Sequence, residues 1–190
     1  MKLSSIQKLT FYTLRKRYAG TKLGIIWSLL TPLIQSVYYI FIFGFVFKQR
    51  FEIGGLSYLS WFLSGFSAWF FFSETLINSL TLFSSNASLI KNFKISKLDL
   101  VISSVITSLP YLIIFGFLAL FLKEDLVFNL SSILLAFIGY ISLFLISLDF
   151  HILFSLIGLA IPDSKHAVPN LLQLFLFTTN AVIPDGTFPA

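Results

Sequence analysis

The chain has 190 residues, of which 57% are hydrophobic, only 11% are charged and none is cysteine. A soluble domain carries about 25% charged residues, so this composition excludes an ordinary water-soluble protein and indicates a chain surrounded mainly by lipid. The lack of cysteine excludes disulfides and thiol chemistry, and the basic inner face of a membrane protein accounts for the net charge of +5 without a nucleic acid.

Segments with few or no charges are long enough to cross a bilayer. A transmembrane helix needs about 20 apolar residues, because each residue rises about 1.5 Å through a hydrocarbon core about 30 Å thick. The gaps between charged residues predict spans at about 25–47, 57–80, 100–122, 131–157 and 167–184. Pro110 lies in the middle of the third span and predicts a kink there.

Residues 3–18 are predicted to form an amphipathic helix in the membrane interface. One side of this helix carries apolar residues and threonines, namely Leu3, Ile6, Leu9, Thr10, Thr13 and Leu14. The opposite side carries the cations Lys8, Arg15 and Lys16. Arg17 departs from this pattern. Gly20 and Gly24 either let the chain turn into the first span or pack two helices closely as a small-xxx-small pair; the turn is favoured.

Lysine and arginine predict the orientation, since short loops rich in these cations stay in the cytoplasm. With the N-terminus inside, ten of the 13 cations lie in inner segments: Lys2, Lys8, Arg15, Lys16, Arg17, Lys22, Lys91, Lys94, Lys97 and Lys165. The outer loops hold Lys48, Arg50 and Lys123. This distribution predicts a cytoplasmic N-terminus.

Aromatic residues are frequent, with 24 phenylalanines, 7 tyrosines and 3 tryptophans. Most are expected to face lipid or to form the interfacial belt of tryptophan and tyrosine. The alternative is a stacking track along which a sugar polymer slides, because aromatic faces hold sugars without strong binding at each site. The candidates for lining such a channel are Tyr38, Tyr39, Trp69, Phe70, Phe71 and Phe72, together with Glu74.

Glu74 and Asp149 are acidic residues inside predicted spans. A carboxylate within a span costs about 2.5–3.5 kcal/mol on insertion scales, so Glu74 is expected to point inward. It either lines a channel or lies near the inner end of its helix, paired with a lysine or a backbone amide. Asp149 and His151 lie about 200° apart around a helix, which disfavours a shared catalytic or metal site.

The segment 84–97, between the second and third spans, combines a Ser/Asn helix-start signal with three lysines. Two interpretations remain open for it. The segment either contacts a cytoplasmic partner or serves as a basic anchor on the inner face of the membrane.

Five stretches in chain order resemble the membrane permease of ABC-type polysaccharide exporters, the family that moves O-antigen, capsule and teichoic-acid chains out of bacteria. The first three are 17–32, Gly65 together with 69–76, and 86–91. The fourth combines Asp163, His166, Pro169 and Leu172, and the fifth is 180–184. The resemblance implies an all-α, polytopic helical membrane protein. Residues 1–190 would be a single permease domain, with an interfacial helix within 1–22 and about five transmembrane helices. Family members have one further span, so the sequence is expected to be truncated at its C-terminus.

The resemblance also implies roles for the matched residues. The approach to the first span would use Arg17, Tyr18, Gly20, Gly24, Trp27 and Pro32. The helix that contacts the ATPase would present Asn86, Ser88, Leu89, Ile90 and Lys91.

The activity so implied is ATP-driven export of a lipid-linked polysaccharide or teichoic-acid-like polymer across the bacterial inner membrane. The sequence has no glycine-rich loop ending in Gly-Lys-Ser/Thr, so ATP and Mg are expected on a separate nucleotide-binding ATPase subunit. This chain is expected to have no catalytic residue and to bind no cofactor or metal itself. Its expected partners are the ATPase, a second copy of the permease, the glycan and the membrane, but no nucleic acid.

Two other classes of protein remain as alternatives. An ATP-independent secondary transporter or channel would use Glu74 and Asp149 as ion or proton sites, but it predicts internal repeats, which the sequence does not show. A membrane-embedded transferase would need clustered acids or histidines, whereas the two histidines and the acids of this chain are scattered.

Overall fold

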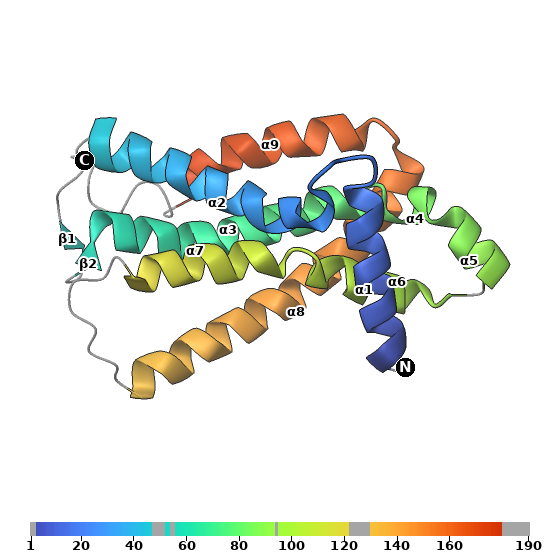
Figure 1. Cartoon of the computed structure of the whole chain (residues 1–190), viewed down its shortest axis with the longest axis horizontal. Coiled ribbons are helices and arrows are strands. Elements are labelled where there is room, and N and C mark those ends of the chain that lie inside the picture. The colour runs from blue at the N-terminus through green and yellow to red at the C-terminus, as the bar shows by residue number, and fades with distance from the viewer. Residues whose placement is uncertain (1–2, 47–51, 54–55, 94, 122–129, 180–190) are drawn as a thin grey trace.

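A computed structural model describes residues 3–46, 52–53, 56–93, 95–121 and 130–179. The described part is almost entirely helical (Figure 1). In chain order it contains α1 (Leu3–Arg17), η1 (Gly24–Ile26), α2 (Trp27–Ile40), η2 (Phe41–Val46), α3 (Tyr58–Ser79), α4 (Leu82–Ser85), α5 (Ala87–Phe93), α6 (Lys97–Ile106), α7 (Leu109–Phe121), α8 (Leu130–Ala160) and α9 (Ser164–Thr178).

A short antiparallel ribbon interrupts the helices between η2 and α3. It consists of β1 (Glu52–Ile53) and β2 (Leu56–Ser57), with Glu52 opposite Ser57 and Ile53 opposite Leu56. The sequence does not predict this ribbon, because two-residue strands are too short to show an alternating pattern.

The long helices α2, α3, α7, α8 and α9 run along the molecule, and α1 crosses them near one end (Figure 1). Helix α3 is at the centre of the bundle, in contact with α7, α8 and α9. The same end of the bundle also holds α4, α5, the start of α6 and the connection between α8 and α9 (Figure 1). We call it the α1 end.

Membrane-length helices are present in the described part of the chain. Lys97–Phe121 and Leu134–Ala160 are long and apolar enough to cross a bilayer, and Gly24–Ile40 is a shorter apolar helix. The fold class predicted from the sequence, a helical membrane protein, is confirmed. Each predicted span coincides with a helix or a pair of consecutive helices, although residues 47, 122 and 180–184 of those spans lie outside the described residues.

The predicted kink at Pro110 is confirmed, and it falls just before the proline. Helix α6 ends at Ile106 and α7 begins at Leu109. A proline has no N–H for an intrahelical hydrogen bond and disfavours helical geometry in the preceding residue, but it is tolerated in the first turn of a helix. The chain therefore breaks at Thr107 and Ser108, two buried polar residues, and restarts with Pro110 in the first turn of α7.

The amphipathic character predicted for α1 is confirmed by burial. Ile6 and Leu9 are buried, whereas Lys8 and Lys16 are exposed. Leu9 packs in a cluster with residues from α4 and α6, namely Leu82, Phe83, Leu100 and Val101. Helix α1 is thus held across the bundle by its apolar side, which packs on α4 and α6.

The turn predicted at Gly20 and Gly24 is also confirmed. Both glycines have positive φ angles, +84° and +53°, which residues with a Cβ rarely adopt. The Thr21 hydroxyl accepts a hydrogen bond from the Gly24 N–H at 3.1 Å and donates to the Tyr18 carbonyl at 2.8 Å. The chain can therefore leave α1 and enter α2 within a few residues.

Helix α8 packs against the end of α3 through a side with small and polar residues. Ser147, His151 and Ser155, spaced four residues apart, are completely or almost completely buried there. Gly158 continues this side of the helix, and a Cβ at that position would collide with the backbone of Leu80. The absence of a side chain at Gly158 therefore sets how closely α8 approaches the turn that follows α3.

We predict that Gly158→Ala destabilises the protein by about 1–3 kcal/mol, because the added methyl must displace backbone. Gly139→Ala in the same helix is the matched control, since nothing lies within 4 Å of a Cβ there and alanine favours a helix by about 1 kcal/mol. Thermal unfolding of both variants in detergent measures the difference. Equal stability of the two variants would contradict the close contact.

Candidate functional site

An ion pair joins the crosswise helix α1 to the central helix α3. Arg17 Nη1 lies 2.9 Å from Glu74 Oε1, and each side chain is 22% exposed. The Asn78 amide, one helical turn after Glu74, donates to the same carboxylate oxygen at 3.0 Å. Glu74 thus points into the protein, as predicted, and its partner is an arginine 57 residues away rather than a lysine or a backbone amide.

The same polar contacts extend to the break between α6 and α7. Arg17 Nη2 donates to the Thr107 hydroxyl at 3.1 Å, and the Asn78 amide reaches the Ser108 hydroxyl at 3.4 Å. We call Arg17, Glu74, Asn78, Thr107 and Ser108 the central polar network. It joins α1, α3 and the α6–α7 break at one point.

The network explains why Arg17 departs from the amphipathic pattern of α1. Arg17 follows Ile6 by eleven residues, so the two side chains lie about 20° apart around the helix axis. Ile6 is buried, and Arg17 therefore points to the protein side of α1. A guanidinium there satisfies the Glu74 carboxylate, which would be costly to leave unpaired within an apolar helix.

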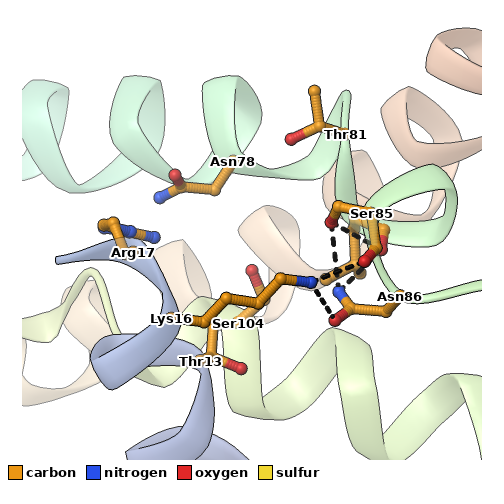
Figure 2. A pocket seen from close by; sticks show the side chains of 9 residues that line it. Thr13, Lys16, Arg17, Asn78, Thr81, Ser85, Asn86 and Ser104 are labelled. Carbon is orange, nitrogen blue, oxygen red and sulfur yellow. Dashed lines mark hydrogen bonds between the residues drawn. The ribbon is translucent and has the colours of Figure 1, made fainter. Parts of the chain in front are cut away.

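A polar pocket lies next to this network at the α1 end. Its volume is about 260 Å³, and it is lined by Thr13, Lys16, Arg17, Asn78, Thr81, Leu82, Ser85, Asn86 and Ser104. The Lys16 ammonium donates to the Ser85 carbonyl at 2.5 Å and to the Asn86 side-chain oxygen at 3.0 Å (Figure 2). The pocket therefore brings together α1, α3, α4 and α6.

The residues predicted to contact an ATPase lie on and just before α5. Ser88 and Lys91 are exposed, and Leu89 and Ile90 are half-buried, with Ile90 packed against the cluster around Leu9. Asn86 is buried, donates to the Leu82 carbonyl at 2.8 Å and accepts from Lys16. Of the five predicted residues, Ser88 and Lys91 are thus the ones whose side chains are open to a partner.

The aromatic residues predicted to line a channel point in different directions. Tyr39, Trp69 and Phe70 line a cavity of about 210 Å³ between α2, α3 and α9, together with Gln35 and Gln173. Tyr38 is exposed and lies edge-on to Tyr39, with ring centroids 5.2 Å apart.

Phe71 and Phe72 contact α8 instead. Phe71 is fully buried and stacks on Phe144, whereas Phe72 packs edge-on against Phe150. The structure therefore brings together three of the candidate aromatic residues and separates the others.

The other residues predicted for the approach to the first span lie at the turn between α1 and α2 or within α2. Tyr18 and Trp27 are half-buried at the two ends of the turn. Pro32 is buried within α2, and its carbonyl accepts a hydrogen bond from the Ser36 hydroxyl at 2.7 Å.

Asp149 and His151 do not share a site. His151 is fully buried in the packing between helices, whereas Asp149 is exposed on the outside of α8. Among the described residues, no hydrogen bond or ion pair joins Asp149 to Glu74, whose partners are Arg17 and Asn78.

Several residues of the site were not singled out from the sequence. Asn78, Thr107 and Ser108 of the network and Lys16 of the pocket belong to this group, as do Gln35 and Gln173 of the aromatic cavity. Two signals could have identified some of them. Asn78 follows Glu74 by one helical turn, and Thr107 and Ser108 immediately precede a mid-span proline, where backbone and side-chain polar groups need partners.

Comparison with known proteins gives distant relatives over nearly the whole chain. Polysialic acid transport protein KpsM of Escherichia coli is 21% identical over 187 residues, which are 97% of this chain and 72% of KpsM. The O-antigen export system permease protein RfbA of Klebsiella pneumoniae is 28% identical over 111 residues, 55% of this chain and 41% of RfbA.

A further RfbA of the same organism is 25% identical over 181 residues, 93% of this chain and 67% of that protein. No protein-family model matches the chain. The resemblance inferred from the sequence motifs is confirmed by these relatives.

We predict that Arg17→Gln and Glu74→Gln each lower the free energy of unfolding by about 1–3 kcal/mol, because each leaves a partly buried polar group without its partner. The double variant should cost less than the sum of the two, with a coupling energy of about 1 kcal/mol. Lys8→Gln, on the exposed side of α1, is the control and should change little. Strictly additive effects in denaturant unfolding would contradict the ion pair.

Proposed function

We propose that this chain, a distant relative of the ABC-type polysaccharide-export permeases, is the transmembrane subunit of an ATP-driven exporter in the bacterial inner membrane. Its cargo is a lipid-linked polysaccharide or a teichoic-acid-like polymer. The observation that carries the proposal is the similarity to KpsM over 97% of the chain, which includes the interfacial helix, the predicted spans and the segment 84–97.

The energy for export comes from a separate ATPase subunit that holds ATP and Mg. This part of the proposal is supported by the sequence, which has no phosphate-binding loop of the Gly-Lys-Ser/Thr type. The permease itself supplies the path across the membrane and the surface on which the ATPase acts.

The α1 end faces the cytoplasm and receives the ATPase. Lys16, Lys91, Lys97 and Lys165 belong to helices that begin or end there, which fits the preference of cations for the inner side of a membrane (Figure 1). Helix α5 presents the exposed Ser88 and Lys91 at this end. We assign the contact with the ATPase to 86–91.

Two copies of the chain enclose the translocation path. Helices α2 and α9 carry exposed apolar side chains along their lengths, among them Leu33, Val37, Leu171 and Leu174, which a second copy or lipid would cover. The cavity that contains Tyr39, Trp69 and Phe70 lies between these two helices and α3, so its aromatic residues are the best candidates for contact with the passing sugar polymer.

Movement of the ATPases reaches the central helix through two consecutive links in this proposal. Helix α5 is connected through Ile90 to the apolar cluster under α1. Helix α1 is connected through Arg17 and Glu74 to α3, which contacts α7, α8 and α9. A displacement of α5 or α1 would therefore shift the central helix of the bundle.

We predict that Lys91→Glu weakens association with the ATPase about tenfold and lowers polymer export, because Lys91 is exposed on α5, within the segment assigned to the contact. Lys165→Glu is the matched control: it reverses an exposed charge at the same end, in the first turn of α9, and should leave association unchanged. Co-purification and polymer at the cell surface provide the two measurements. Normal export by Lys91→Glu would remove α5 from the proposed contact.

A further inference from the structure

The polar pocket at the α1 end has the composition of an anion site. Its lining includes the cations Lys16 and Arg17 and the hydroxyls of Thr13, Thr81, Ser85 and Ser104, but no acidic residue. Hydroxyl, amide and ammonium groups are the donors that proteins use to hold phosphate oxygens.

Arg17 and Lys16 differ in whether a neighbouring acidic side chain neutralises their positive charge. Arg17 is neutralised by Glu74 at 2.9 Å. Lys16 donates only to neutral acceptors among the described residues, the Ser85 carbonyl and the Asn86 side-chain oxygen. The pocket therefore keeps an uncompensated positive charge on Lys16, and an ammonium on a flexible stem suits a phosphate as a point charge.

Arg17 can contribute without giving up Glu74. A guanidinium has five N–H donors, and the described residues accept two hydrogen bonds from it, at Glu74 and Thr107. The remaining donors are available on a side chain that lines the pocket. Figure 2 shows Lys16 and Arg17 on the same side of the pocket, with Ser85 and Asn86 opposite Lys16.

The size and the place of the pocket fit a phosphate carried on a lipid. A water molecule occupies about 30 Å³ of the liquid, so a volume of about 260 Å³ holds a phosphate or diphosphate with some water. The pocket borders α1, the helix that the sequence predicts to lie in the membrane interface. Lipid phosphates are concentrated at that depth.

We propose that this pocket binds the phosphate group of a lipid through Lys16 and Arg17. Two sources carry this chemistry: the phosphate that joins the exported glycan to its lipid carrier, and the headgroup of an anionic membrane lipid. The first source rests on the function proposed above, in which the cargo is lipid-linked. Binding there would connect α1 to α4 through the ligand, next to the Arg17–Glu74 pair.

The test uses the full chain with the partners that accompany it, reconstituted in phosphatidylcholine nanodiscs. Three probes are titrated: a polyprenyl diphosphate, phosphatidylglycerol and the uncharged polyprenol. We expect the diphosphate to bind and Lys16→Gln to weaken it about tenfold, whereas Lys16→Arg stays within about threefold of the wild type because it keeps the charge. Lys8→Gln, an exposed cation of the same helix outside the pocket, should leave the affinity unchanged.

Comparison of the three probes and the variants separates the possible outcomes. Preference for the diphosphate over phosphatidylglycerol, lost in Lys16→Gln, assigns the site to the lipid carrier, and equal binding of the two assigns it to the headgroup. Equal losses in Lys16→Gln and Lys8→Gln, or binding of the uncharged polyprenol as tight as that of the diphosphate, would overturn the proposal. Phosphate binding by a chain that never associates with an ATPase would contradict the exporter function and leave the pocket assignment intact.

Discussion

The constraint on which the arrangement depends is a carboxylate inside an apolar helix. Glu74 would be costly within the apolar helix α3 without a partner, and Arg17 supplies one from a helix that lies across the bundle. This pairing requires that α1 stay near α3, that the turn at Gly20 and Gly24 be tight, and that Thr107 and Ser108 lie close enough to share the polar contacts. The ion pair thus joins α1 to the central helix α3, in addition to the apolar cluster around Leu9.

Much of this architecture is predictable from the sequence because it follows from local rules. Charge-free lengths located the long helices, the periodicity of α1 located its buried side, and Pro110 located the break between α6 and α7. The exception to the α1 pattern, Arg17, proved to be the residue that carries the long-range contact. Its partner lies 57 residues away, and a single sequence contains no local signal for such a pairing.

Other features were not predictable, or were predicted too simply. Residues 69–72 are consecutive and spread over about 300° around the helix, so the four side chains cannot all share one face: Trp69 and Phe70 line a cavity, while Phe71 and Phe72 meet α8. The pocket around Lys16 combines residues of four helices and depends on how α1 crosses α6, which only the assembled fold defines. The two-residue strands are below the length at which any pattern is visible.

One ion pair connects the basic end of the bundle, where an ATPase would bind, to the central helix. In this proposal the chain works as the membrane half of such a complex. The most direct measurement is to isolate the tagged chain from its native membrane in mild detergent and identify its partners by mass spectrometry. The natural sequence has no cysteine, so Ser88→Cys provides a single thiol for crosslinking. We predict a stoichiometric ATPase subunit that crosslinks at this position; a chain that is isolated without an ATPase would contradict the account.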